Sequence, residues 1–282
     1  MLEQTVTIVA NERDTDQYFS LVLRAPQIAP VIQPGQFAHV RILPLKDALL
    51  RRPFSIFQVA GDTFSILYKT VGKGTDALSR MRAGEELSII APLGHGFTMP
   101  QTDGEIPLLV AGGYGMAAMF LLAQRSPQRG LVFVGGRRRV DILCEKEFAA
   151  LGWDVRATTE DGSHGEKGLV TQPLLAELRR SRGNEAQTKK SETSQSLLTS
   201  AATHRKLKLF ACGPTPMLKA IGKIAEDFNL PAELSMDEHM CCGLGVCLTC
   251  VIPVKTSDGW EYQRTCTEGP VFDSRQIVWE TA

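Results

Sequence analysis

Near its C-terminus the chain carries four cysteines within ten residues, in the stretch HMCCGLGVCLTC, and a further cysteine in QRTCTEG. A folded core does not require so many neighbouring thiols, whereas thiolates at such short spacing can hold a metal. With Cys242 as the first ligand, the pattern is C-x4-C-x2-C through Cys247 and Cys250, followed by fifteen residues and then Cys266. This is the plant-type spacing of a 2Fe-2S cluster, in which a loop wraps one edge of the cluster and a distant cysteine closes it.

The adjacent pair of cysteines leaves a choice of register. A pattern that starts at Cys241 has five residues before Cys247 instead of four. Neighbouring side chains point to different sides of a chain, so we expect Cys242 to be the ligand and Cys241 to be a small buried filler. Gly243 and Gly245 suit the loop, because residues without a Cβ let backbone N–H groups turn toward the sulfides. A structural zinc site is the alternative, but its ligands usually form two C-x2-4-C pairs, and here the second pair is missing.

Composition narrows the class of protein. The chain has 282 residues, 43% of them hydrophobic, which suits two domains and a small third. The 31 Lys and Arg residues equal the 31 Asp and Glu residues, so no overall field favours nucleic acid. Seven cysteines, an odd and mostly clustered number, argue against a secreted disulfide framework. The sequence also shows no signal peptide and no stretch near the roughly 18–20 apolar residues of a spanning helix, so we expect a cytoplasmic protein with no nucleic-acid or membrane partner.

Two kinds of pattern divide the chain. Residues 4–98 hold short runs rich in β-branched and aromatic residues, separated by Gly, Pro and Asp turns, which predicts an antiparallel barrel. One helix, TDALSRM, interrupts these runs, and Thr75 is its expected N-cap. From Ile106 strands and helices alternate, which indicates a parallel sheet with crossover helices. One of those helices, ILCEKEFAAL, contains Cys144, which we interpret as a packing thiol.

The fold class is therefore multidomain, with β and α/β parts. We expect an antiparallel β-barrel over residues 1–101, a Rossmann-like α/β domain over 102–234 and a small 2Fe-2S cluster domain over 235–282. Residues 181–206 are polar, rich in Ser and Thr and without periodicity, so they predict a flexible inserted loop. A docking element for a partner is the alternative for this insert.

Two motifs of the barrel could bind a pyrophosphate. RRPFS begins at Arg51 where a strand starts, and Pro53 predicts an edge or a bulge there. An arginine at that place offers a planar fork for a pyrophosphate, and the serine can reach a ring nitrogen. In GKGTDALSRM, Gly72 and Gly74 permit close backbone approach, and the free N–H groups of the helix start form an anion site. Either motif alone could be a basic turn or a capped surface helix, but both within one barrel favour binding.

The α/β part carries a candidate nucleotide turn. VAGGYGMAAM, with Gly112, Gly113 and Gly115, follows a predicted strand and opens a helix, although it lacks the full G-x-G-x-x-G fingerprint. A tight turn for packing is the alternative. After the second strand, GGRRR places Arg137 to Arg139 where an arginine can accept the 2′-phosphate of NADP, and a solvated basic turn is again the alternative.

The order of barrel, Rossmann-like domain and terminal cysteine cluster resembles the ferredoxin reductase superfamily, and within it the electron-transfer subunits of dihydroorotate dehydrogenase B. The cysteine and RRPFS motifs are specific, whereas the glycine motif alone is not. The family usually has a proline where Ala118 stands, which puts the helix start in doubt. The matching segments cover nearly the whole chain outside the insert: LLRRPFSI, LYKTVGKGTDALS, PLGHGF, AGGYGMAAM, EDGSHGEKGLVT, ACGPTPML and MCCGLGVCLTC.

The resemblance implies FAD in the barrel, between the two large domains. It places Cys212 and Gly213 of ACGPTPM beside a nicotinamide stacked on the flavin, where a buried strand-end thiol is the alternative. Hydride transfer there needs mainly alignment, so no side chain is assigned as catalytic beyond Cys212 near the nicotinamide. NAD is favoured over NADP. The residues assigned by position to FAD are Arg52, Pro53, Phe54, Ser55, Leu67, Tyr68, Lys69, Gly74 and Thr75.

A cluster, a flavin and a nicotinamide site in one chain convert between one-electron and hydride chemistry. Nothing in the sequence resembles an FMN barrel or a pyrimidine site, so the resemblance implies a partner. That partner is an FMN-containing dihydroorotate dehydrogenase subunit in de novo pyrimidine (UMP) biosynthesis, with two of each chain in a heterotetramer. Electrons would pass from FMN through the 2Fe-2S cluster and FAD to NAD+. The alternatives are the flavin subunit of a ferredoxin-dependent NADP+ reductase or sulfide dehydrogenase, and a zinc-stabilised non-catalytic binding module.

Overall fold

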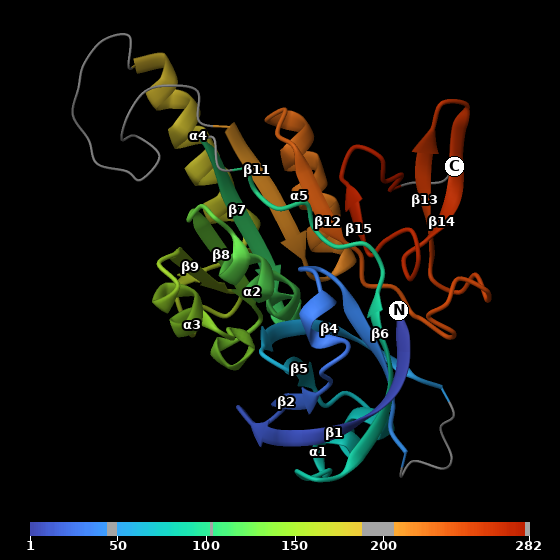
Figure 1. The fold of residues 1–282 in the computed structure, drawn as a ribbon. Coiled ribbons are helices and arrows are strands. Elements are labelled where there is room, and N and C mark those ends of the chain that lie inside the picture. The colour runs from blue at the N-terminus through green and yellow to red at the C-terminus, as the bar shows by residue number, and fades with distance from the viewer. Residues whose placement is uncertain (44–49, 102–103, 188–205, 280–282) are drawn as a thin grey trace.

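The computed structural model describes residues 1–43, 50–101, 104–187 and 206–279. A closed β-barrel is followed by a layered α/β structure and then by a C-terminal segment that carries a β-hairpin (Figure 1). In the part of the chain that the structure describes, no helix is long and apolar enough to cross a membrane.

The barrel is antiparallel throughout, with strand order β1-β2-β5-β4-β3-β6. Alternate side chains of its strands, such as Leu21, Leu23 and Ile66, point inward and are fully buried, as the period-2 pattern predicts. The barrel elements are β1 (Leu2–Arg13), β2 (Tyr18–Arg24), a short 3-10 helix (Ala29–Val31), β3 (Phe37–Arg41), β4 (Arg52–Ala60), β5 (Thr63–Lys69), α1 (Lys73–Ser79) and β6 (Glu86–Leu93).

Two local predictions in the barrel have different outcomes. Pro53 pairs with His39 of β3, but the register of β4 with β5 starts only at Ile56 and is irregular there, so the predicted edge or bulge is confirmed. Thr75 is not the N-cap, because α1 begins at Lys73 after an extended Gly72. The hydroxyl of Thr75 instead accepts hydrogen bonds from the N–H groups of Val71 and Gly72, at 2.9 and 3.2 Å, from within the first turn.

The α/β part is a seven-stranded sheet of order β10-β9-β8-β7-β11-β12-β15, parallel except for β15. Helices α2 and α3 pack on one face, and α4 and α5 on the other. Its elements are β7 (Glu105–Gly112), a 3-10 turn (Gly113–Gly115), α2 (Met116–Arg125), β8 (Leu131–Gly136), a 3-10 turn (Arg139–Asp141), α3 (Glu145–Ala150), β9 (Asp154–Thr159), β10 (Glu166–Lys167), α4 (Thr171–Gln187), β11 (Lys206–Cys212), α5 (Thr215–Asp227) and β12 (Ala232–Ser235).

Two predictions in this part were wrong in their limits. Cys144 precedes α3 rather than lying within it, and its φ of 58° is left-handed backbone that stops the helix from starting earlier. The predicted insert at 181–206 is helical over its first seven residues, because α4 continues to Gln187. Arg182 explains part of that extension, since its guanidinium stacks over Phe228 at 4.2 Å and donates to the carbonyl of Asp227. Residues 188–205 of the insert lie outside the described residues.

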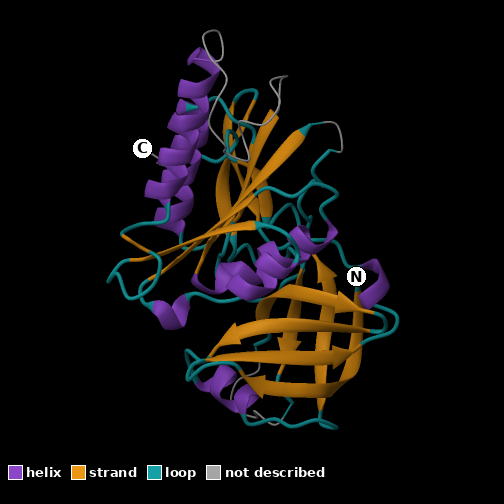
Figure 2. Cartoon of the chain, turned by 90° about the vertical axis from the view of Figure 1, so that its left-hand side faces the viewer, coloured by secondary structure: helices purple, strands orange, loops and turns teal. Residues whose placement is uncertain are grey.

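The C-terminal segment touches both larger parts. Its hairpin consists of β13 (Val251–Thr256) and β14 (Gly259–Arg264), after which β15 (Val271–Asp273) returns to the edge of the α/β sheet beside β12. Helix α2 lies between the sheet and the barrel (Figure 2), and Phe120 stacks on Phe57 of β4 with ring centroids 4.6 Å apart. The barrel, the sheet and the terminal segment therefore hold one another in place.

Asp141 fixes a second contact between the barrel and the α/β part. Its Oδ1 accepts a hydrogen bond from the Tyr18 hydroxyl at 3.0 Å and pairs with Lys69 Nζ at 3.2 Å, and its side chain is almost fully buried. Burial alone raises the pKa of Asp141, but the hydrogen bonds from Lys69 and Tyr18 outweigh it and hold the pKa below its usual value. The carboxylate therefore stabilises the folded chain in its charged form.

We expect Asp141→Asn to lower the free energy of unfolding at neutral pH by about 1–3 kcal/mol, because charged hydrogen bonds are lost at a buried site. Since the folded-state pKa is lowered, this contribution is complete above the unfolded pKa of about 4 and is lost as pH falls through the folded-state value. Urea unfolding should therefore show the variant and the parent converging below about pH 4.

The control is Asp62→Asn, whose ion pair with Arg24 is exposed on both sides and should contribute less than about 1 kcal/mol. Equal effects of the two substitutions at neutral pH would contradict the interpretation of Asp141 as an anchor between the two parts.

Candidate cofactor-binding sites

The two predicted pyrophosphate motifs meet in the structure. The guanidinium of Arg52, at the start of β4, lies against Gly74 in the first turn of α1, where any Cβ would overlap Nε, Cζ and Nη2 of the arginine. Gly74 must therefore lack a side chain for this contact to exist. By contrast, a Cβ on Gly72 would meet no atom within 4 Å. The geometry joins a cationic fork to a close backbone turn, which suits a pyrophosphate.

The side chains of Leu67, Tyr68 and Lys69, the predicted flavin contacts on β5, point in two directions. Tyr68 points into the barrel core, where it stacks on Phe19 at 5.5 Å and donates from its hydroxyl to Asn11 at 3.1 Å. Leu67 instead packs with residues of the α/β part, and Lys69 reaches Asp141 there. Phe54 of the RRPFS motif meets Tyr68 edge-on at 5.9 Å. Leu67 and Lys69 are thus the members of the group that face the seam between the domains.

The nucleotide turn lies at the place where the sheet topology reverses. From β7 the chain builds outward through β8 and β9, then crosses to β11 and β12 on the other side. Ligands of open α/β sheets bind outside the carboxyl ends of the strands at such a switch point. Gly112 ends β7 and Cys212 ends the adjacent β11. A Cβ on Gly115 would overlap the backbone carbonyl of Cys212, so the turn after β7 lies directly against the end of β11.

The chemistry at this crevice is that of a neutral thiol. Cys212 is only 6% exposed, and burial, followed by the charge of Asp237, raises its pKa to about 12. A hydrogen bond with Ser235 only partly opposes this rise. Cys212 can therefore line a pocket, but it does not supply a thiolate at neutral pH. Nearby, the hydroxyl of Tyr114 donates to Asp237 at 2.7 Å and links the nucleotide turn to the segment that leads into the cysteine loop.

The cysteine loop curls in the way that the glycines predict. Gly243 and Gly245 have φ of +69° and +80°, a backbone conformation that glycine adopts without steric cost. The N–H of Leu244 donates to Sγ of Cys242 at 3.3 Å, and the hydroxyl of Thr249 donates to Sγ of Cys247 at 3.2 Å. Donors turned toward sulfur stabilise a negatively charged ligand.

The four predicted ligands lie as two neighbouring pairs, Cys242 with Cys247 and Cys250 with Cys266. Hydrogen bonds from Thr249, and then from Cys242, lower the pKa of Cys247 to about 6. Burial, and then Cys250, raises the pKa of Cys266 to about 12. Among the described residues, no three metal-ligating side chains are placed to hold a single metal ion. Two pairs of sulfurs are instead the donor set that a 2Fe-2S cluster requires, so the residues fit that group.

A salt bridge braces the loop from behind. Arg264 Nη1 donates to the carbonyl of Gly245 at 2.9 Å, and its Nε donates to Glu268 at 2.8 Å. The hydrogen bond from Arg264 lowers the pKa of Glu268 to about 2.

The expectation for Cys241 was wrong, because this thiol is half-buried beside Cys247 instead of filling a core.

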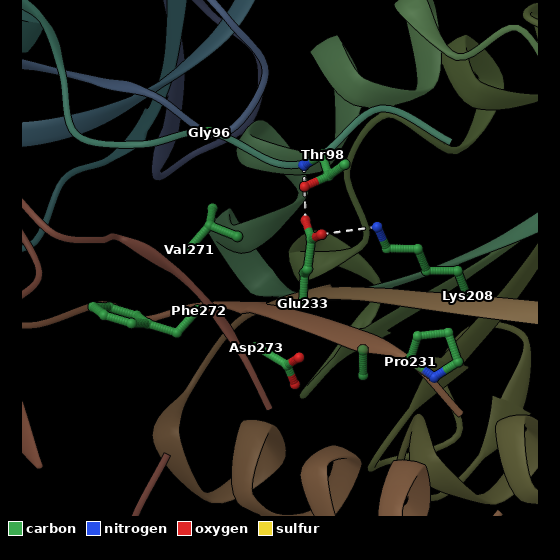
Figure 3. A pocket seen from close by; sticks show the side chains of 9 residues that line it. Gly96, Thr98, Lys208, Pro231, Glu233, Val271, Phe272 and Asp273 are labelled. Atoms are coloured by element: carbon green, nitrogen blue, oxygen red, sulfur yellow. Dashed lines mark hydrogen bonds and ion pairs between the residues drawn. The ribbon is translucent and has the colours of Figure 1, made fainter. Parts of the chain in front are cut away.

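A hollow of about 300 Å³ lies elsewhere, between the loop after β6 and strands β11, β12 and β15 (Figure 3). Its polar groups satisfy one another: Glu233 pairs with Lys208 at 2.8 Å and accepts from the N–H of Thr98 at 2.8 Å. Lys208 lies four residues before the carboxyl end of β11, roughly 13 Å along the strand. The hollow therefore does not lie at the switch point between β7 and β11, and it contains none of the predicted site residues.

Sequence reasoning missed several residues that contact the candidate sites. Asp141 and Asp237 act through partners far away in the sequence, and no local pattern marks such contacts. One of the missed residues, His39, could have been noticed in the sequence. A histidine flanked by apolar residues in a predicted barrel strand, here FAHVRI, is unusual for a position that faces solvent. The structure buries His39 completely against the cysteine loop.

Comparisons with known proteins agree with this geometry. Residues 237–278 match the family model "Iron-sulfur cluster binding domain of dihydroorotate dehydrogenase B". Over 261 residues, covering 91% of this chain and 90% of the relative, the sequence is 34% identical to the dihydroorotate dehydrogenase B (NAD+) electron transfer subunit of Desulforamulus reducens. The subunit of that name from Shouchella clausii is 34% identical over 279 residues, 97% of each chain. The chain belongs to the family of dihydroorotate dehydrogenase B (NAD+) electron transfer subunits.

Solved structures support the fold of this family member. A structure of an NADH-dependent reduced ferredoxin-NADP oxidoreductase matches with a TM-score of 0.73 at 23% identity, over 97% of this chain and 90% of that one. A ferredoxin NADP+ reductase from Neisseria gonorrhoeae matches with a TM-score of 0.58 at 15% identity, over 80% and 91% of the two chains. The predicted family, fold class, oxidoreductase electron-transfer role and iron–sulfur domain are thus confirmed. The alternative of a zinc-stabilised binding module has no support.

We expect Gly74→Ala to weaken FAD binding by about tenfold or more, because the added methyl must displace the Arg52 guanidinium. The control is Gly72→Ala, two residues earlier, where the backbone is extended and the added methyl meets no atom within 4 Å. Flavin content after gel filtration and the FAD dissociation constant, followed by flavin fluorescence, measure the effect. Equal loss of FAD from both variants would show that Arg52 does not hold the flavin.

Proposed function

We propose that this chain passes electrons from an FMN-containing dihydroorotate dehydrogenase subunit, through a 2Fe-2S cluster and FAD, to NAD+, as a step of de novo pyrimidine biosynthesis. The observation that carries the proposal is the position of the cysteine loop. Cys250 and Cys266 pack against Phe37, Ile90 and Leu93 on the outer face of β3 and β6. Strand β3 pairs directly with β4, the strand that bears the RRPFS motif. Only one strand therefore separates the cluster loop from the flavin motif.

For the cluster we propose Cys242, Cys247, Cys250 and Cys266 as ligands. Cys242 forms hydrogen bonds with Cys247 and its charge also acts on Cys266, whereas Cys241 lies beside Cys247 without a corresponding effect on Cys266. This supports the register that begins at Cys242. When bound, the cluster supplies one-electron chemistry, and the N–H of Leu244 and the hydroxyl of Thr249 stabilise the negative charge on its ligands.

For FAD we propose the barrel face that looks toward the α/β part. Arg52 beside Gly74 and Thr75 would hold the pyrophosphate, and Ser55, which pairs with Phe37 in the strand ladder, would meet the ring. Pro53 and Phe54 shape the strand between them. Leu67, Tyr68 and Lys69 would follow from the neighbouring strand, with Tyr68 contributing backbone because its side chain lies in the core.

For the nicotinamide nucleotide we propose the crevice at the switch point, lined by Gly112, Gly113, Gly115, Cys212 and Gly213. These residues have small side chains or none, so they leave room for the nicotinamide and allow it to align with the flavin. Alignment is the main requirement of hydride transfer. The neutral Cys212 fits that role, since it adds no charge beside the transferred hydride.

We propose NAD as the dinucleotide, because the relatives are named for NAD+. Of the arginines that could accept the 2′-phosphate of NADP, Arg139 already contacts His164 at 2.5 Å. Kinetics with NADH and NADPH separate this proposal from the ferredoxin-dependent NADP+ reductase alternative.

The partner and the assembly are also proposals. Leu244, Val246 and Leu248 of the cysteine loop are exposed, with Val246 at 81%, and apolar side chains around a redox centre suit a protein interface. We propose that this surface meets the FMN subunit in a cytoplasmic heterotetramer of two chains of each kind. We also propose the domain limits 1–101, 102–234 and 235–282.

The test of the whole route is dihydroorotate-dependent reduction of NAD+ by the co-purified complex, with no such activity in this chain alone. A native complex with another subunit, or a preference for NADP+, would contradict the proposed route.

We expect Cys242→Ser to remove the cluster's visible absorption and nearly all electron transfer from dihydroorotate to NAD+, while FAD stays bound, because a ligand thiolate is lost. Cys241→Ser is the matched control, one residue away, and should retain iron. Iron and sulfide analysis with visible spectra measures both variants. The opposite result would move the ligand register by one residue.

We expect Val246→Glu to weaken association with the FMN subunit by at least about tenfold, because a charge would be buried in an apolar interface. Val31→Glu, at an exposed valine of the barrel, is the control. Analytical ultracentrifugation of the mixed subunits measures association, and iron content shows that the loop is intact. Unchanged association of the Val246 variant would place the partner elsewhere.

A further inference from the structure

His39 lies in the middle of β3 with its side chain on the outside of the barrel. Its strand neighbours Ala38 and Val40 belong to the barrel core, so the alternation of the strand turns His39 the other way, with Phe37. An outward side chain of a barrel normally meets water. His39 is nevertheless fully buried, because the cysteine loop covers it.

The contact with the loop is close. A Cβ on Gly243 would overlap Nδ1 and crowd Cε1 of the histidine, so the ring occupies the space that the missing side chain leaves. Backbone groups of Cys242 and Arg51 also lie within reach of a hydrogen bond to the ring. Gly243 therefore has two reasons to be glycine, its left-handed φ and the presence of this ring.

Neither ring nitrogen of His39 has a hydrogen-bond partner of good geometry among the described residues. Leaving a buried donor or acceptor unpaired costs about 1–3 kcal/mol, and buried polar atoms in folded proteins are almost always paired. An imidazole buried in this way points to a function at the site that it faces. That site is the loop from Cys242 to Gly243, next to the first proposed cluster ligand.

The imidazole offers both kinds of hydrogen-bonding group. An uncharged ring has one N–H donor and one acceptor nitrogen. A neutral donor adds a dipole at the cluster without adding a charge.

We propose that His39 is a positioning residue of the electron relay, whose N–H forms a hydrogen bond with the Cys242–Gly243 part of the loop when the cluster is bound. The proposal rests on the proposed function, since it assumes a cluster held by Cys242. With a cluster bound, this hydrogen bond would place the positive end of the N–H dipole beside the Cys242 ligand. Hydrogen bonds around cluster sulfurs stabilise the added electron and so raise the reduction potential.

The strand ladder extends this role toward the flavin. His39 pairs with Pro53 and Phe37 pairs with Ser55, and adjacent strands lie about 4.8 Å apart. The residue that braces the cluster loop is thus the direct ladder neighbour of the flavin motif.

The test compares His39→Leu, which removes the hydrogen bond at similar volume, with His39→Gln, which keeps a donor. The reduction potentials of the cluster and of FAD are measured separately, by redox titration followed with electron paramagnetic resonance and visible spectra. We expect His39→Leu to shift the equilibrium between reduced cluster and reduced flavin about tenfold toward the flavin, which is about 59 mV for one electron. His39→Gln should restore most of the shift, with the flavin potential and iron content unchanged in both variants.

A second variant covers the case in which His39→Leu loses its cluster. Gly243→Ala must displace the His39 ring, and it should lower the cluster potential in the same direction. Gly61→Ala is its control, since Gly61 also has a positive φ but a Cβ there meets nothing within 4 Å.

An unchanged cluster potential in His39→Leu, or equal shifts in the Leu and Gln variants, would overturn the proposed hydrogen bond. A parent protein that contains no iron would instead overturn the proposed function. The two failures are therefore distinguishable.

Discussion

The arrangement depends on one unusual surface, the outer face of strands β3 and β6. The outside of an antiparallel barrel is ordinarily polar, yet here Phe37, Ile90 and Leu93 point outward and are buried under Cys250 and Cys266. This apolar contact carries the cysteine loop to the barrel, and β15 then ties the same segment to the α/β sheet. Without that face, the loop could fold around its own ligands but would have no fixed distance from the flavin strand.

The seam between the two large parts meets a different requirement, because the dinucleotide that we propose must reach it. It is fixed at its sides by the stack of Phe57 on Phe120 and by the buried carboxylate of Asp141. At the turn that follows β7, next to the switch point, the Tyr114 hydroxyl donates to Asp237 of the segment that leads into the cysteine loop. These fixed contacts hold the two large parts together beside the proposed dinucleotide site and so keep the distance between β4 and the cysteine loop constant.

What the sequence predicts well is local. The cysteine spacing predicts the iron–sulfur domain because a few residues of one loop decide it. Strand and helix periods predict the barrel and the sheet because burial acts on successive residues. The start of α1 and the length of α4 were missed because single contacts decide them: the Thr75 hydroxyl bonds backward from inside the helix, and Arg182 stacks on Phe228 of another element. The burial of Cys241 was predicted wrongly for a similar reason. Two adjacent cysteines are not both expected to be ligands, but their adjacency does not show whether the second thiol is buried.

His39 shows most clearly why part of a site escapes sequence analysis. In the strand His39 is one polar residue among apolar ones. Its environment depends on Gly243, which lies far away in the chain. Gly243 is itself explained locally by its backbone conformation. Each of the two residues has a sufficient local explanation, so neither indicates in the sequence that it contacts the other. The pairing becomes visible only when the loop covers the strand and leaves two ring nitrogens that have no hydrogen-bond partner of good geometry in the part of the chain that the structure describes. A buried imidazole in that state is stable only if the surrounding structure gains more than it loses, and the nearest source of such a gain is the cluster that the loop is built to hold.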